Sequence, residues 1–275
     1  MVENCLKNPV TGTDVGNIVN IGIYMNSTNI IKFYQNLIDS FKNYTNNKIS
    51  FDDKVYINCR ALTIDEAIGN PERKDYPLLQ GKEVLLEADY KGFKGQAYTD
   101  KPSNFNGSIK EILNLDINKE TSRAILIATI NAVLRSLNNE IKTKHCKDEE
   151  PTECAHNICN FLLNKGYKKI LMIGFQPAIA DALKEKFELI VLDRNKDNIG
   201  NYKNGILIYD GYKNSDYLYD KVDIVLATGS TLVNGSIVDI IDKATIYNKD
   251  LYCYGTTIAG ASLLLGLNRL CFNAH

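Results

Sequence analysis

The 275-residue chain has no tryptophan, three methionines, three histidines and six prolines, and its charges nearly cancel. Its 32 Lys and Arg residues against 33 Asp and Glu residues give a net charge of −1. A nucleic-acid partner is therefore not expected, because such binders usually carry a basic field. Apolar runs near the roughly 20 residues that cross a bilayer are also lacking, so we expect no membrane association.

Secretory features are lacking as well. Residues 1–7 contain neither a basic segment nor an apolar one, which argues against a signal peptide. The seven cysteines are an odd number and show no C-x-x-C spacing, so a disulfide framework is not indicated. We expect a cytoplasmic protein with reduced thiols. The number of subunits is not fixed by the sequence, and a homo-oligomer stays open.

What is present is an ordinary globular composition, with 44% hydrophobic and 24% charged residues. At roughly 150 residues per domain, the length suggests two domains. Residues 156–275 are predicted to form a Rossmann-like domain, a parallel sheet with helices on both faces, because short apolar runs alternate with helical segments. The expected strands are residues 168–173, 188–192, 205–209, 222–227 and 251–254, and the expected helices are residues 178–186, 236–244 and 259–265.

Residues 1–140 have a different pattern and predict a smaller α+β domain. The expected helices are residues 30–44 and 122–137, and the expected strands are residues 54–59, 83–90 and 95–99. Asn131 is an amide within an apolar helix and needs hydrogen-bond partners. It either ties the helix to a loop or reaches a site between the domains. Residues 141–155 are charged and are interpreted as a linker.

The turns after the expected parallel strands are the first candidate binding positions. Gly174 follows the first strand, but a second and third glycine are missing and Pro177 removes an N–H donor, so tight binding of NAD or FAD is not expected. Asp193 ends the second strand, where it either binds a ligand diol or caps a turn. Asn234 and Ser236 are good helix caps, which is the alternative to a role in ligand binding.

The segment after the fourth strand is rich in glycine, hydroxyl and amide groups and predicts a loop that faces an anion or a polar ligand. Together with the turn after the fifth strand, it supplies the candidates Thr228, Gly229, Ser230, Thr231, Asn234, Gly235 and Thr256.

The expected linker carries the candidate metal ligands. Imidazole and thiolate groups suit zinc, nickel or copper, so a transition-metal ion is the expected cofactor. The candidate ligands are His145, Cys146, Glu149, Glu150 and Cys154. The alternative is a solvated linker with buried thiols, because the usual spacing of a four-ligand site is missing. Two further polar turns, at residues 66–75 and 98–107, have the composition of solvent-facing loops.

Several of these segments resemble a two-domain prokaryotic family named for "putative heavy-metal chelation". In that family a Rossmann-like domain follows a domain similar to the N-terminal domain of enolase. The resemblance is carried by LTIDEAIGNPERKDYPLLQGKE (62–83), GQAYTDKPSNFNGSI (95–109), IATINAVLR (127–135), HCKDEEPTECA (145–155), IGFQPAIADAL (173–183), VLDRN (191–195) and ATGSTLVNGS (227–236).

The resemblance implies a ligand held in a cleft between the two domains. The turns at Gly174, Asp193 and 228–235 would be faced by loops that carry Asn70, Arg73 and Asp100, with residues 145–154 along the rim. Binding or handling of a heavy metal ion, or of a metal-bearing small molecule, is the first hypothesis.

Two rival hypotheses stay open. The protein could be an enzyme acting on a nucleotide-like or pterin-like molecule, with Glu66, Asp75 or Asp100 as general base. It could also be a structural or partner-binding protein without a small-molecule ligand.

Overall fold

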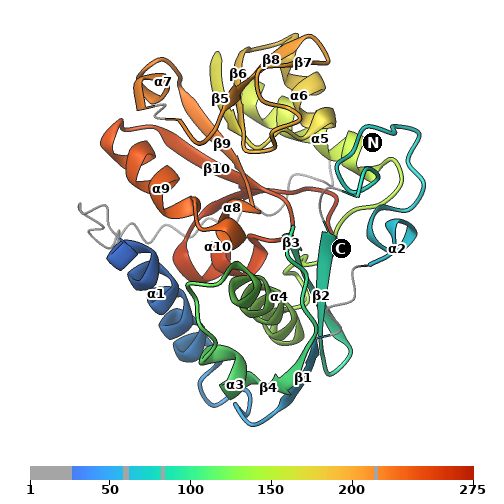
Figure 1. Ribbon diagram of the computed structural model, residues 1–275, viewed down its shortest axis with the longest axis vertical. Coiled ribbons are helices and arrows are strands. Elements are labelled where there is room, and N and C mark those ends of the chain that lie inside the picture. The colour runs from blue at the N-terminus through green and yellow to red at the C-terminus, as the bar shows by residue number, and fades with distance from the viewer. Residues whose placement is uncertain (1–26, 58–61, 82–83, 214–215) are drawn as a thin grey trace.

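A computed structural model describes residues 27–57, 62–81, 84–213 and 216–275 (Figure 1). The first seven residues and the ends of two expected strands, at residues 58–59 and 83, lie outside these ranges. The first half contains α1 (Ser27–Thr45), β1 (Lys54–Ile57), α2 (Ile64–Ile68), β2 (Val84–Tyr90), β3 (Phe93–Thr99), β4 (Phe105–Ser108), α3 (Ile109–Leu113) and α4 (Glu120–Leu137).

The four strands of the first half form an antiparallel sheet in the order β3-β2-β1-β4. Strands β2 and β3 form a hairpin, with Tyr90 paired to Phe93 next to the turn. Strand β4 and the short helices α2 and α3 were not predicted. Each short helix begins with a capping box, at Thr63 with Glu66 and at Ser108 with Glu111. The first half is thus a small α+β region, as expected.

The second half contains a seven-stranded sheet in the order β11-β10-β9-β5-β6-β8-β7. All pairs are parallel except β7 with β8. The elements are α5 (Glu150–Asn164), β5 (Lys169–Ile173), α6 (Pro177–Lys184), β6 (Glu188–Asp193), β7 (Tyr202–Lys203), β8 (Ile206–Asp210), α7 (Asp216–Asp220), β9 (Ile224–Thr228), α8 (Thr231–Asn234), α9 (Ile237–Ile246), β10 (Asp250–Tyr254), α10 (Ala259–Leu265) and β11 (Asn268–Leu270).

The order of the strands determines where a ligand can enter. The chain moves outward from β5 through β6 and β8, and then returns to the other side of β5 at β9. The order reverses between β5 and β9, and open α/β sheets bind ligands at such a switch point, beside the carboxyl ends of the strands. Gly174 and Thr228 stand at these two strand ends.

Helix α4 packs against β2 and β3 of the first sheet and against α8 and α10 of the second half (Figure 1). Every residue from 122 to 134 is buried, which explains why apolar residues occur on every side of this helix. Strand β3 packs directly on its backbone, because a Cβ at Gly95 would lie 2.1 Å from the nitrogen of Ala132. One continuous core therefore joins α1, α4 and the first sheet to one face of the parallel sheet.

The other face of the parallel sheet is covered by α5 and α6. Alternating side chains of β5 supply both faces, with Leu171 in the core on the α4 side and Ile170 and Met172 in the core on the α5 side. Tyr76 and Leu85 of the first half also belong to this second core. Within the described ranges, no helix combines the length and the apolar character that crossing a bilayer requires.

Residues 141–155, interpreted as a linker from their composition, are buried in part. Thr143 is fully buried, and its hydroxyl donates to the carbonyl oxygen of Lys94 at 2.6 Å. Cys146 is 5% exposed, and α5 already begins at Glu150, with Pro151 in its first turn. The charged composition reflects side chains that hydrogen-bond neighbouring loops. The domain boundaries at residues 140 and 155 stay predictions.

Candidate functional site

A cleft of about 1380 Å³ lies along the carboxyl edge of the parallel sheet, between the two halves of the chain. One wall consists of the segments that follow β5, β6, β9, β10 and β11. The facing wall comes from the end of β3 and from residues 145–154. Most of the predicted site residues line it: Gly174, Asp193, Thr228, Gly229, Ser230, Thr231, Asn234, Gly235, Asp100, His145, Cys146 and Cys154.

The ends of β5 and β9 lie very close together at Gly174. Its φ is +90°, and a Cβ there would lie 2.5 Å from Cγ2 of Thr228. The carbonyl oxygen of Gly174 accepts a hydrogen bond from the hydroxyl of Tyr254 at 2.7 Å. Only glycine meets both requirements, the positive φ and the close approach of the two strand ends. The single glycine of this turn therefore shapes the cleft and does not form a dinucleotide fingerprint.

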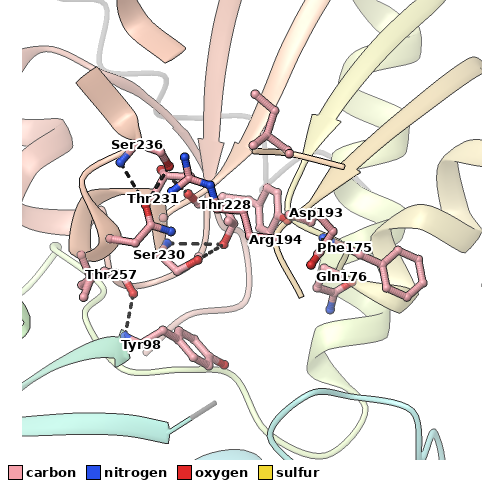
Figure 2. A pocket seen from close by; sticks show the side chains of 18 of the residues that line it. Tyr98, Phe175, Gln176, Asp193, Arg194, Thr228, Ser230, Thr231, Ser236 and Thr257 are labelled. Atoms are coloured by element: carbon pink, nitrogen blue, oxygen red, sulfur yellow. Dashed lines mark hydrogen bonds between the residues drawn. The ribbon is translucent and has the colours of Figure 1, made fainter. Parts of the chain in front are cut away.

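Asp193 acts as a cap in this structure. One carboxylate oxygen accepts the N–H of Phe175 at 2.6 Å, and the other accepts the N–H of Asn195 at 2.6 Å. These bonds fix the turns after β5 and β6 relative to each other (Figure 2). A ligand diol would have to share these oxygens with the backbone. The role of Asp193 in ligand binding stays a prediction.

The loop after β9 satisfies most of its polar groups internally. The Thr231 hydroxyl donates to the carbonyl oxygen of Thr228 at 2.6 Å, and Oδ1 of Asn234 accepts from both the N–H and the hydroxyl of Ser236. The hydroxyls of Thr228 and Ser230 lie 3.2 Å apart on the cleft side (Figure 2). The groups that this loop offers to a ligand are therefore mainly hydroxyls, and not a set of free backbone N–H groups.

Two side chains of the first half hydrogen-bond the backbone of the loop after β9. Nε of Arg123 in α4 donates to the carbonyl oxygen of Val233 at 2.7 Å, and the hydroxyl of Tyr34 in α1 donates to the carbonyl oxygen of Leu232. Arg123 is 7% exposed and also binds the carbonyl oxygens of Ile117 and Asn118. Local sequence does not reveal the role of Arg123 or Tyr34, because their partners are more than 100 positions away.

Tyr98 and His145 form the facing wall. The backbone N–H of Tyr98 donates to the hydroxyl of Thr257 at 3.0 Å, which joins β3 to the turn after β10 (Figure 2). The rings of Tyr98 and His145 pack edge to face, 5.5 Å apart. Nδ1 of His145 is buried without a hydrogen-bond partner, and burial lowers the pKa of the ring to about 4. Thr256 is buried beside this wall and does not line the cleft.

The predicted metal ligands do not converge. Among the residues that the structure describes, no three His, Cys, Asp or Glu side chains lie close enough together to hold one metal ion. Oε1 of Glu149 accepts the backbone N–H of Glu72 at 2.6 Å, and Glu150 accepts the N–H of Lys147 and pairs with Nε2 of His275 at 2.8 Å. The five-residue ligand set therefore does not fit a metal, although three of its members line the cleft.

Three cysteines line the cleft, unlike the carboxylates of Glu149 and Glu150. Cys146 and Cys154 line the cleft together with Cys271, which follows β11. A hydrogen bond between Cys154 and Cys271 raises the pKa of Cys154 and lowers the pKa of Cys271 to about 6, and Arg269 lowers the latter further. Burial raises the pKa of Cys146. Local sequence does not connect Cys271 with Cys154, because the two residues lie 117 positions apart.

Asn70 and Arg73 do not line the cleft. The backbone N–H of Asn70 donates to Asp148 at 2.9 Å. Arg73 binds Asp75 and reaches Asp181 of α6 at 2.6 Å, so it bridges the two halves next to the cleft. That Asn70 and Arg73 bind a ligand stays a prediction.

Glu120 is a cleft residue that the sequence analysis missed. It lines the cleft with Asp100, and burial together with this neighbouring carboxylate raises its pKa. Lys101 pairs with Glu120 at 3.0 Å. Of the three predicted general bases, Asp100 lines the cleft. Glu66 belongs to a capping box and Asp75 is bound by Arg73.

Comparisons with known proteins agree with the motifs. Residues 157–259 match the DUF364 family model, described as "Putative heavy-metal chelation". A DUF364 protein of unknown function from Pyrococcus horikoshii has a TM-score of 0.51 and 17% sequence identity, and the match covers 81% of this chain and 78% of that one. A DUF364 protein of unknown function from Desulfitobacterium hafniense has a TM-score of 0.48 and 12% sequence identity. This match covers 88% of this chain and 85% of that one.

No curated protein matches the chain. The Pyrococcus structure supports the fold, an α/β protein with a mostly parallel second sheet and a smaller α+β region. Similarity of the first half to the N-terminal domain of enolase is not shown and stays a prediction. The family predicted from the sequence is thus found in the second half of the chain, where residues 157–259 match DUF364, the family described as "Putative heavy-metal chelation".

Proposed function

We propose that this protein binds a metal-bearing small molecule in the cleft between its two halves. One observation carries the proposal: a single cleft has hydroxyl groups at the switch point, from Thr228 and Ser230, and sulfur atoms from Cys146 and Cys154. A bare ion would need only the sulfur atoms, and a purely organic ligand only the polar end. The family description supports the metal part of the proposal.

The chemistry of the donors restricts the metal. Thiolate sulfur suits soft and borderline ions, whereas structural zinc sites use four protein ligands. The buried, neutral ring of His145 has an unpartnered Nδ1 that could accept a ligand group on the same wall. The carboxylates of Glu149 and Glu150 are engaged by backbone N–H groups and by His275, and we assign them no role in binding.

Native mass spectrometry with elemental analysis tests the proposal on full-length protein purified anaerobically without a histidine tag. We expect an additional mass that contains a metal. Ser230→Phe should fill the polar end and abolish this mass, whereas Asn46→Phe adds the same ring at an exposed position outside the cleft and should retain it. Protein without any additional mass, or equal loss in both variants, would contradict the proposal.

One observation favours a second candidate, an enzyme acting on a nucleotide-like or pterin-like molecule. Asp100 and Glu120 form a carboxyl pair at the edge of the cleft, and the raised pKa of Glu120 suits proton transfer. This candidate predicts a metal-free organic mass in the same spectra. It also predicts a higher melting temperature with nucleotides or pterins, and failure of both observations would eliminate it.

A further inference from the structure

We propose that Arg194 binds an oxyanion, a carboxylate or a phosphate group, on the ligand of the cleft. Arg194 directly follows β6 and lines the cleft next to Asp193 (Figure 2). The inference rests on the proposed function, because it names a chemical group of the same ligand. It concerns the organic part of that ligand and not its metal.

Arg194 is a cleft cation without a partner. In the part of the chain that the structure describes, four Lys and Arg side chains line the cleft, and Arg194 alone has no carboxylate partner. Lys101, Lys213 and Lys243 each pair with a carboxylate, at distances from 2.7 to 3.8 Å. Hydrogen bonds between a guanidinium and a carboxylate or phosphate are strong, so the unpaired Arg194 is the cleft cation best suited to a ligand anion.

The two acidic residues that end β6 and β8 do not neutralise Arg194. Both carboxylate oxygens of Asp193 accept backbone N–H groups. Oδ1 of Asp210 accepts the N–H of Tyr212 at 2.9 Å, and Oδ2 lies 3.8 Å from Nζ of Lys213. These carboxylates stabilise the turns in which they lie, and the guanidinium keeps its donors for a ligand.

The ring of Tyr212 supports the guanidinium. Cζ of Arg194 lies 4.8 Å from the centre of this ring. Gly211 lets the two segments approach, because its N–H donates to the carbonyl oxygen of Asp193 at 2.7 Å and a Cβ there would lie 2.9 Å from the same oxygen. Stacking covers one face of the planar guanidinium and leaves the N–H groups at its edge, which can bind both oxygens of one anion.

The register of the strands indicates the size of the ligand. Strand β5 lies between β9 and β6, and the pairing places Thr228 and Asp193 on either side of Gly174. Two strand spacings, about 10 Å, therefore separate the hydroxyl end of the cleft from the strand end that carries Arg194. A ligand that lies across Gly174 can contact the hydroxyls at one end and Arg194 at the other.

NMR titration of the full-length protein with sodium phosphate and with sodium acetate tests the inference. The Nε–H signal of Arg194, identified by its absence in Arg194→Gln, should shift saturably with at least one of these probes. The backbone amide signals of Asn195 and Tyr212 measure the affinity in the wild type and in the variants. Arg194→Gln should weaken binding by about tenfold or more, because it removes hydrogen bonds to a charged group.

Lys196→Gln is the matched control. It removes the same charge two positions away, from an exposed side chain outside the cleft, and should bind like the wild type. Tyr212→Leu removes the supporting ring and should weaken binding by about two- to fivefold, whereas Tyr212→Phe keeps the ring and should retain the affinity.

The two probes also distinguish the source of the oxyanion. Tighter binding of phosphate assigns a phosphorylated ligand, and tighter binding of acetate assigns a carboxylic acid. A signal of Arg194 that moves with neither probe would overturn the inference. Equal affinity in Arg194→Gln and the wild type would do so too, as would an equal loss in Arg194→Gln and Lys196→Gln.

Native mass spectra of the same variants separate this inference from the proposed function. The additional mass expected in the wild type should decrease in Arg194→Gln and persist in Lys196→Gln. Binding of a probe at Arg194 without any additional mass in the wild type would reject the proposed function alone. An additional mass that is lost in Ser230→Phe but persists fully in Arg194→Gln would reject the inference alone.

Discussion

Asn131 shows how one side chain connects the two halves behind the cleft. It is fully buried in α4, and its Nδ2 donates to the carbonyl oxygens of Gln96, Thr256 and Thr257 at 2.9 to 3.2 Å. Its Oδ1 accepts the N–H of Gly260 at 2.7 Å. The amide thus joins β3 to the start of α10, which is the tie between helix and loop that the sequence analysis had offered as one of two roles.

Asn131→Leu should therefore lower the free energy of unfolding by about 2–4 kcal/mol, because it leaves several buried backbone groups without partners. Thr129→Val is the matched control on the same helix. Its hydroxyl bonds only the carbonyl oxygen of Ile125 one turn away, so we expect a loss below about 1 kcal/mol. Urea denaturation measures both values, and similar losses would contradict the role assigned to Asn131.

At the scale of elements, helix α4 holds the loop that follows β9. Arg123 reaches the carbonyl oxygen of Val233 and two carbonyl oxygens of the segment before α4. Lysine cannot reproduce this planar fork of donors. Arg123→Lys should therefore loosen residues 231–235 and raise their amide hydrogen-exchange rates by about tenfold or more, while the strands keep their protection.

Arg135→Lys provides the comparison for this exchange experiment. Arg135 lies on the same helix and makes one long hydrogen bond, of 3.4 Å, to the carbonyl oxygen of Ile141. We expect no change at residues 231–235 in this variant. Unchanged exchange in Arg123→Lys would show that the loop keeps its shape without α4.

The elements themselves were largely predictable where burial governs the sequence. Strands β5, β6, β8, β9 and β10 are continuous apolar runs, because both faces of the sheet are covered. Strand β4, with the sequence FNGS, has no such pattern and looked like a polar loop. In residues 141–155, the charged composition conceals the buried Thr143.

The site was predictable only in part, for a related reason. Strand ends can be located from local sequence, so Gly174 and the loop at 228–235 were found. Other interactions join residues more than 100 positions apart in the sequence. Examples are the interaction of Cys271 with Cys154 and the hydrogen bond from Arg123 to the carbonyl oxygen of Val233. Hydrophobic periodicity contains no information about such pairs.

At the scale of the whole molecule, the two halves also meet outside the core, beside the cleft. Arg73 of the first half binds Asp75 at 2.5 Å and Asp181 of α6 at 2.6 Å. Asn204, on the turn after β7, donates to both carboxylates. Burial raises the pKa of Asp75, but the hydrogen bonds from Arg73 and Asn204 outweigh it and hold this pKa below its ordinary value of 3.8.

The sign of the pH dependence follows from this shift. As the pH falls, the unfolded chain takes up the proton on Asp75 before the folded chain does, so the folded state loses stability in that range. The contribution of the bridge should be complete above about pH 5 and should disappear as the pH falls through the folded pKa. Because both carboxylates are partly exposed, we expect about 1 kcal/mol or less.

Arg73→Met removes the cation that joins the two halves. Stability measured by urea denaturation should then fall less steeply between pH 5 and 3, since Asp75 returns toward its ordinary pKa. Amide exchange at residues 70–76 should rise, because this loop loses its bond to α6. Lys91→Met removes a similar pair, with Asp53, inside the first half, and should leave exchange at 70–76 unchanged. If both variants loosen this loop equally, Arg73 does not join the two halves at the cleft.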